Sequence, residues 1–159
     1  MKHLTIMLKP ASSLCNLRCK YCFYADITSL REVSSFGVMK ESAITAVMDH
    51  IFIDLDDGDY LTLSFQGGEP MLAELPFYRN LVQYIAGKKR NIHINYTLQT
   101  NGILLDDDWC KFLAKYGFLI GISLDILPES HDAVRVDTAG QGTYEQVLRS
   151  ISLLKKYHI

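Results

Sequence analysis

The stretch YLTLSFQGGEP, residues 60–70, is the clearest sign of how this chain folds, because an apolar run gives way abruptly to a glycine turn. Residues 60–66 have the length and apolar content of a buried strand, and Gly67 and Gly68 end that strand. A segment with helical spacing follows at residues 76–89 and begins with a proline, which suits the first position of a helix. The stretch therefore predicts one strand followed by one helix.

The same unit recurs along the chain. Apolar runs of strand length alternate with segments of helical period, and Thr143 precedes the last of these segments as an expected N-cap. Four strand-then-helix units in series predict an α/β fold with a parallel sheet, right-handed crossovers and helices packed on the sheet. The predicted strands are residues 3–9, 60–66, 93–100 and 118–124, and the predicted helices are residues 39–55, 76–89, 106–117 and 143–159.

A loop of unusual composition follows each predicted strand. Parallel α/β sheets gather their functional residues in the loops at the carboxyl ends of the strands. We therefore expect these loops to lie together and to form the site. They are the cysteine-containing segment after the first strand, QGGEP after the second, QTNG after the third and SLD after the fourth.

The composition fits one ordinary domain. The 159 residues are 48% hydrophobic and 21% charged, and the formal net charge of -2 gives no bulk attraction to nucleic acid or to an anionic membrane surface. No apolar run approaches the roughly 20 residues of a membrane span, and Lys9 and Pro10 interrupt the first apolar stretch too early for a signal peptide. We expect a cytoplasmic protein whose thiols stay reduced.

Three cysteines stand close together in SSLCNLRCKYCFY, residues 12–24. Cys15, Cys19 and Cys22 have the spacing CxxxCxxC, whereas a structural zinc site takes four protein ligands and commonly pairs two separated knuckles. The fourth cysteine, Cys110, lies in a predicted amphipathic helix and is expected to pack as a small apolar side chain. Three thiolates suit a [4Fe-4S] cluster that leaves one iron open to a small molecule.

The sequence resembles the radical S-adenosylmethionine (SAM) superfamily, whose hallmark CxxxCx(aromatic)C stands here as CNLRCKYC. More narrowly, KPASSLCNLRCKYCFY, LSFQGGEPMLA, LQTNGILLDDDW and HDAVRVD resemble the anaerobic sulfatase-maturating enzymes. The resemblance spans essentially all 159 residues and implies that SAM occupies the open iron through its amino and carboxylate groups. It also implies that an electron from the cluster cleaves SAM to methionine and a 5'-deoxyadenosyl radical.

The resemblance assigns contacts with SAM to several of these loops. Gly68 and Glu69 are expected to meet the amino group, since an ammonium needs an acceptor, and Arg135 is expected to hold the carboxylate. The structural alternatives are a simple glycine turn and a surface ion pair of Arg135 with Asp132 or Asp137. The full set of expected cofactor contacts is Tyr21, Gln66, Gly67, Gly68, Glu69, Gln99, Ser123 and Arg135, beside the metal ligands Cys15, Cys19 and Cys22.

The chain departs from the family pattern at Ile126 and in its length. The family has SLDG or SMDG after the fourth strand, whereas this chain has SLDI, and a β-branched residue adopts positive φ only at a cost. We therefore expect the loop at residues 125–131 to take another path. Residues 1–159 correspond to the N-terminal portion of a radical SAM core domain, with about four βα units of the six in a partial parallel barrel. The resemblance places the general base and a C-terminal cluster domain beyond residue 159.

The fourth predicted strand, FLIGISL at residues 118–124, would leave an apolar edge without a partner. An uncovered edge of this kind promotes association or aggregation. We expect the chain to be a fragment, a truncated gene product or a half-barrel that self-associates through the open edge.

The hypothesis that follows is a radical SAM oxidoreductase that converts a sulfatase cysteine or serine to formylglycine. Its expected partners are a sulfatase or other peptide substrate and an external one-electron donor such as flavodoxin or ferredoxin, with no nucleic acid and no membrane. Two alternatives stay open: another radical SAM peptide modification, such as thioether formation, and a catalytically silent module that binds a cluster or zinc.

Overall fold

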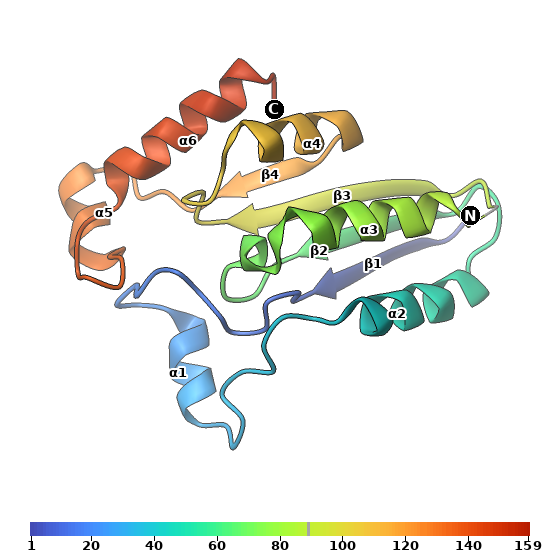
Figure 1. Cartoon of the computed structure of the whole chain (residues 1–159), viewed down its shortest axis with the longest axis horizontal. Helices are drawn as coiled ribbons and strands as arrows, with labels where there is room; N and C mark the ends of the chain where they lie inside the picture. The colour runs from blue at the N-terminus through green and yellow to red at the C-terminus, as the bar shows by residue number, and fades with distance from the viewer. Residues whose placement is uncertain (89) are drawn as a thin grey trace.

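The computed structural model describes residues 1–88 and 90–159 and contains a four-stranded parallel sheet (Figure 1). Neighbouring strands pair in parallel and in sequence order, so their carboxyl ends meet at one edge. This arrangement confirms the predicted α/β class and its parallel sheet. The strands are β1 (His3–Leu8), β2 (Tyr60–Phe65), β3 (His93–Thr100) and β4 (Leu119–Ile122).

The four predicted helices are present and are joined by three short helical segments that the sequence patterns do not predict. The predicted ones are α2 (Glu41–Ile53), α3 (Glu74–Ala86), α4 (Asp107–Tyr116) and α6 (Tyr144–Lys156). The short ones are α1 (Phe23–Ser29), the 3-10 turn η1 (Pro70–Ala73) and α5 (Pro128–Val134). Helix α1 buries no side chain and extends away from the sheet (Figure 1), so it has no apolar period to detect. Among the described helices, none combines the length and the apolarity that spanning a bilayer would require.

Local sequence signals set both ends of α4. The side chain of Asp106 accepts a hydrogen bond from the backbone N–H of Trp109 at 2.8 Å and caps the first turn. The helix ends at Gly117, whose φ of 64° lies in the left-handed region that favours glycine. Cys110 is buried in the same helix, which confirms its predicted packing as a small apolar side chain.

Two predicted helix starts need correction. Helix α3 begins at Glu74, so Pro76 lies within the first turn rather than at the first position. Thr143 precedes α6 as predicted, but its hydroxyl does not cap that helix. Asp132 takes this role, because its Oδ1 accepts a hydrogen bond from the backbone N–H of Tyr144 at 2.9 Å.

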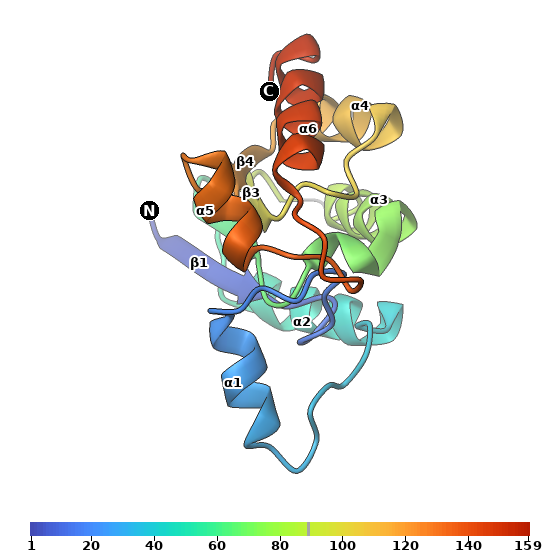
Figure 2. The same cartoon turned by 90° about the vertical axis from the view of Figure 1, so that its left-hand side faces the viewer.

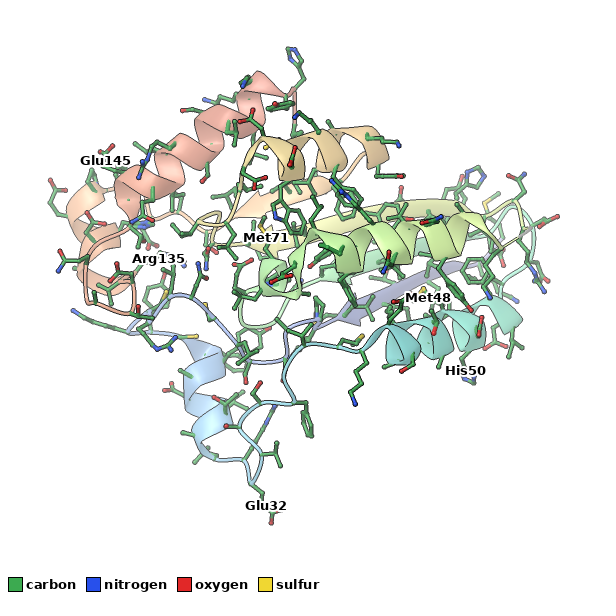
Figure 3. All side chains as sticks on the ribbon, viewed as in Figure 1. Glu32, Met48, His50, Met71, Arg135 and Glu145 are labelled. Carbon is green, nitrogen blue, oxygen red and sulfur yellow. The ribbon has the colours of Figure 1, made fainter. Side chains whose placement is uncertain are left out.

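One face of the sheet packs against α2, α3 and α4 and forms the core; we call it the covered face (Figure 2). Every second residue of β2, namely Leu61, Leu63 and Phe65, is fully buried there. Figure 3 shows Met48 pointing from α2 toward the sheet and His50 pointing away from it, in line with the complete burial of Met48. Burial of these apolar side chains supplies most of the driving force for folding.

The other face of the sheet, which we call the open face, carries the alternate residues of the same strands and is largely polar. The stacked rings of His3, Tyr60 and His93 cross its amino-terminal end, with centroid distances of 4.6 and 4.5 Å. Further along, the hydroxyl of Thr97 donates to Ser64 Oγ at 2.9 Å. This face therefore presents mainly hydroxyl, ring and amide groups, with the exposed apolar side chains of Met7 and Leu119 toward its two edges.

Strand β4 lies at an edge of the sheet. It pairs with β3 on one side, and no other described strand pairs with it. Leu119 is 71% exposed at this edge, which confirms the expected apolar edge. Self-association through it remains a prediction.

Candidate active site

The cysteine loop, which we define as residues 9–22, crosses the carboxyl ends of the strands (Figure 1). The turn after β2 fastens one side of this loop through backbone hydrogen bonds. Gly68 N–H donates to Ser12 O at 3.1 Å, and Glu69 N–H donates to Leu14 O at 2.6 Å. The two motifs are therefore parts of one structural unit.

The segment after α5 fastens the other side of the cysteine loop. Arg18 N–H donates to Val136 O at 2.7 Å, and Lys20 N–H donates to Val134 O at 2.8 Å. Residues more than 100 positions apart thus frame the three cysteines. This contact places Arg135, which lies between the two accepting residues, against the cysteine loop (Figure 3).

The two glycines after β2 are required by the backbone of the cysteine loop. A Cβ at Gly68 would lie 2.1 Å from Leu14 O, and a Cβ at Gly67 would lie 2.9 Å from Ser12 O. Gly67 also has a φ of 98°, which L side chains rarely adopt. The sequence predicts a close approach here to a ligand, and the structure identifies the cysteine loop as the group that approaches.

A cavity of about 270 Å³ lies beside the cysteine loop at this edge of the sheet. The structure brings all the expected metal ligands and cofactor contacts together around it, although they come from widely separated segments. Their role in binding remains a prediction. The expected residues that line the cavity are Cys15, Cys19, Cys22, Tyr21, Gln66, Gly67, Gly68, Glu69, Gln99, Ser123 and Arg135.

The three thiols of the loop are half-buried and sit in unlike surroundings. Cys15 Sγ accepts a hydrogen bond from the backbone N–H of Leu17 at 3.4 Å, and burial raises the pKa of this thiol. Burial also raises the pKa of Cys19, an effect that the nearby guanidinium of Arg135 opposes. Without a metal, Cys15 and Cys19 are therefore held toward the protonated form.

The arrangement of these thiols suits a cluster better than a single ion. Within residues 1–88 and 90–159, no three side chains of His, Cys, Asp or Glu are gathered tightly enough to hold one metal ion. A cubane takes its thiolates on different irons, so it accepts sulfurs that stand further apart than those of a mononuclear zinc site. Thiolates are also the usual ligands of iron–sulfur clusters. The donor set thus fits a [4Fe-4S] cluster with three protein ligands.

The carboxylate of Glu69 is buried and already accepts hydrogen bonds from the protein. Its Oε1 accepts from Met71 N–H at 3.0 Å and from the Thr100 hydroxyl at 2.8 Å, and its Oε2 accepts from Asn101 N–H at 2.8 Å. Burial is the main cause that raises the pKa of this group, while the three donors lower it. Glu69 therefore ties the ends of β2 and β3 together, and Oε2 retains room for one further donor.

Arg135 forms an ion pair inside the site. Its Nε donates to Asp125 Oδ2 at 2.9 Å, and its guanidinium lies 5.1 Å from the ring centre of Tyr21. The hydroxyl of Tyr21 donates to the same Oδ2 at 3.2 Å. The ion pair expected as the structural alternative thus exists, but with Asp125 rather than with Asp132 or Asp137.

Gln99 and Ser123 meet at the carboxyl end of the open face. Gln99 Nε2 donates to Ser123 Oγ at 3.3 Å. Gly121 leaves room for this amide, because a Cβ there would lie 2.2 Å from Gln99 Oε1. Gln66 Nε2 donates to Ser64 Oγ at 3.4 Å, so both glutamines are linked to hydroxyl groups of the sheet.

Two asparagines near Cys15 escape detection by sequence reasoning as a pair. Asn101 Nδ2 donates to Asn16 Oδ1 at 2.8 Å and lies 3.8 Å from Cys15 Sγ. Asn101 also reads as an ordinary turn residue before a glycine, which hides its second role. Only its position opposite the cysteine loop, which the sheet register fixes, identifies it as a neighbour of the sulfur.

The loop after β4 accommodates Ile126 without positive φ, since the non-glycine residues with positive φ in the described chain are Ser12, Glu74 and His158. Ile126 is 87% exposed, and α5 begins two residues later. The side chain therefore points to solvent at no backbone cost. The expectation that this loop differs from the family's path remains a prediction.

Comparison with known proteins matches residues 10–159 to the radical SAM superfamily. The cysteine-type anaerobic sulfatase-maturating enzyme of Clostridium novyi (strain NT) is 41% identical over 160 residues, which cover 100% of this chain and 42% of that enzyme. The serine-type anaerobic sulfatase-maturating enzyme of Bacteroides thetaiotaomicron is 32% identical, over 99% of this chain and 38% of that enzyme. A solved structure, native anSMEcpe with bound AdoMet and Kp18Cys peptide, superposes with a TM-score of 0.85 at 37% identity, over 98% of this chain and 41% of that chain. The chain thus spans about two fifths of the length of these relatives.

Proposed function

The chain belongs to the radical SAM superfamily, and we propose on this basis that Cys15, Cys19 and Cys22 hold a [4Fe-4S] cluster beside a binding site for SAM. In a protein of the relatives' length, the proposed activity is oxidation of a sulfatase residue to formylglycine. The 159 residues would supply the part of this activity that binds and cleaves SAM.

One observation carries the proposal: the three cysteines and every residue expected to contact SAM line a single cavity of about 270 Å³. Surface residues chosen by chance from distant segments would not converge in this way. The solved structure of anSMEcpe that superposes on this chain has AdoMet bound.

Residues of opposite charge would bind the two charged groups of the methionine end of SAM. Arg135 is 17% exposed and offers a cation with several donors to the carboxylate of SAM, with the hydroxyl of Ser123 on the same cavity. Glu69 Oε2 can accept one further hydrogen bond, and the amino group of SAM would donate it. Asn101 supports Cys15 with an amide donor beside its sulfur.

When bound, the cluster supplies the electron that cleaves SAM to methionine and a 5'-deoxyadenosyl radical. Phe23 and Tyr24 line the same cavity as the cysteines; Phe23 is 67% exposed, so the half-buried ring of Tyr24 is the one that limits the access of water to this chemistry. An external one-electron donor such as flavodoxin or ferredoxin would renew the electron. Reduced thiols and an oxygen-sensitive site suit the cytoplasm.

The proposed substrate is a cysteine in a sulfatase peptide. The chain is 41% identical to the cysteine-type relative and 32% identical to the serine-type relative, which favours cysteine over serine. A peptide is bound in the matching structure of anSMEcpe.

Anaerobic reconstitution of the chain with iron and sulfide tests the cluster and SAM together. We expect about four irons per chain, a reducible cluster by electron paramagnetic resonance, and 5'-deoxyadenosine after addition of SAM and dithionite. Cys19→Ser should abolish all three signals, and Cys110→Ser should leave them unchanged because Cys110 lies in the core.

A single bound zinc ion with no 5'-deoxyadenosine would contradict the proposal and support a silent metal-binding module. A sulfatase-derived cysteine peptide, followed by mass spectrometry for the aldehyde, then separates sulfatase maturation from other radical peptide modifications.

A further inference from the structure

Arg135 is held in place by protein groups. Asp125 Oδ2 accepts from both its Nε and the hydroxyl of Tyr21, and the ring of Tyr21 lies beneath the guanidinium. Asp125 thus holds the charged end of Arg135 and the ring that supports it. A long arginine side chain on a surface would otherwise be free to sample many rotamers.

A buried histidine fixes the backbone on both sides of this ion pair. His131 is fully buried, its Nδ1 accepts from the backbone N–H of Asp125 at 3.3 Å, and its Nε2 lies 3.1 Å from Thr143 Oγ1. The Thr143 hydroxyl donates to Arg135 O at 3.0 Å, so its only proton is committed there. Nε2 must therefore carry the hydrogen, and His131 is a neutral imidazole with a single tautomer.

The consequence is a closed chain of contacts. Asp125 and Arg135 are paired through their side chains, and His131 with Thr143 links their backbones. Helix α5 lies between Asp125 and Arg135 in the sequence. These contacts therefore also set the position of that helix relative to β4.

The geometry leaves the useful donors of Arg135 available. A guanidinium carries five N–H donors in a plane; Asp125 takes the one on Nε, and the guanidinium also lies beside the Cys19 thiol. The donors on the two Nη atoms can then bind a carboxylate without first ordering the side chain. Preorganisation of this kind increases affinity because less conformational freedom is lost on binding.

We propose that Asp125, backed by His131 and Thr143, is a positioning residue that holds Arg135 ready for the carboxylate of SAM. This inference rests on the proposed function, since it takes SAM as the ligand, but it concerns residues that the resemblance does not assign to SAM. The competing possibility is that Asp125 occupies Arg135 and must be displaced, in which case its removal would strengthen binding.

A pair of ligands that differ only in the carboxylate tests the proposal. We would measure affinities of the reconstituted chain for SAM and for decarboxylated SAM by anaerobic calorimetry, for the wild type, Asp125→Asn and the control Asp26→Asn. Asp26 lies on the exposed helix α1, so its variant removes the same charge away from Arg135. Asp125→Asn should weaken SAM binding about tenfold, the scale of one charge-assisted hydrogen bond, and leave the analogue unaffected.

A second variant pair reports on the contact behind the ion pair. Thr143→Val removes the hydroxyl that links His131 to Arg135, whereas Thr143→Ser retains it. We expect a smaller, about threefold, loss of SAM affinity in Thr143→Val, again without effect on the analogue, and recovery in Thr143→Ser.

The remaining outcomes separate this inference from the proposed function. A wild type that binds neither ligand overturns both. Equal wild-type affinity for SAM and its analogue leaves the SAM site standing but overturns the role of Arg135 and hence that of Asp125. Equal losses for both ligands in Asp125→Asn indicate a general structural role, and tighter SAM binding indicates competition by Asp125. Either result overturns the inference.

Discussion

The covered and open faces of the sheet are built from alternate residues of the same strands, yet they follow opposite rules. On β2, Leu61 and Leu63 are completely buried against helices, whereas the residues between and beside them, such as Thr62 and Ser64, are half-exposed. The covered face is held by close apolar packing, and the open face by individual hydrogen bonds. A shift of one residue along a strand therefore moves a side chain from the apolar core to a face held by hydrogen bonds.

The largest expected contrast is between neighbouring residues of β2. Phe65 packs on Tyr78 and Phe118 with ring centroids 5.0 and 6.1 Å apart, so Phe65→Ala should lower the free energy of unfolding by about 3–5 kcal/mol. Ser64→Ala, on the open face, removes the acceptor of two partly exposed hydrogen bonds, from Thr97 and from Gln66, and should cost about 1 kcal/mol. Urea denaturation followed by circular dichroism measures both. Similar losses at the two positions would break the distinction between the faces.

A smaller effect on stability is expected where the turn after β2 meets the cysteine loop. Gly68→Ala would force a Cβ against Leu14 O and should lower the free energy of unfolding by about 1–3 kcal/mol. If the cysteine loop has separated from the turns on either side, the amides of Glu69 and Arg18 should exchange their hydrogens faster. Gly87→Ala, at the end of α3, is the matched control and should leave both amides unchanged. Unaltered exchange in Gly68→Ala would mean that the turn and the loop are not coupled.

The buried His131 makes the segment around α5 sensitive to acid. Burial and the charge of Arg135 lower the pKa of His131 below the ordinary value of about 6.5, although Asp125 and Asp132 oppose this effect. The unfolded chain then binds a proton that the folded chain does not, so the stability from this group is lost as pH falls below about 6.5, at up to about 1.4 kcal/mol per pH unit.

Nuclear magnetic resonance of the His131 ring measures this pKa directly, and urea denaturation at pH 7.5 and 5.5 measures its effect on stability. The ring should remain mainly neutral at pH 6.5. A titration midpoint at or above that value would contradict the lowered pKa and the loss of stability expected in acid.

The smallest expected effect is a difference in reactivity between the thiol of Cys110 in the core and the three thiols of the cysteine loop. Burial raises the pKa of Cys110 to about 11, so roughly one thiol in a thousand is ionised at pH 8. In the metal-free chain, iodoacetamide should modify Cys15, Cys19 and Cys22, which are half-buried, before it reaches Cys110. Mass spectrometry of peptides gives the order of modification, and urea should abolish the protection. Early modification of Cys110 would show that the covered face opens readily.

The covered face of the sheet and the helices packed on it are the part of the fold that the sequence predicts well. Apolar periodicity identifies the four strands and the helices α2, α3, α4 and α6, because these elements repeat a buried residue at a fixed interval. The short helices α1 and α5 have too little buried surface to leave such a pattern. The actual cap of α6, Asp132, also lies too far back in the chain for a local capping signal to reveal it.

The sequence predicts much of the lining of the cavity but not the contacts that hold it together. Motif spacing and resemblance identify eleven of the sixteen residues that line the cavity, from Cys15 to Arg135. They do not reveal Asp125, whose carboxylate is significant only because α5 brings Arg135 back to it. His131 is likewise one of five histidines in the sequence, and only its complete burial between two loops distinguishes it.

The cysteine loop is anchored lightly compared with the strands that it crosses. It contributes Ala11 and Leu17 to the buried core, and its remaining ties are hydrogen bonds. Backbone groups bond to the turns on either side, and side-chain bonds join Asn16 to Asn101 and Tyr21 to Asp125. Segments with few buried apolar contacts detach at a lower free energy than the core, so this loop can open while the sheet stays intact. On the proposed function, iron and sulfide would thus be delivered to a chain that has already folded, in contrast to zinc fingers, in which metal uptake and folding are one event.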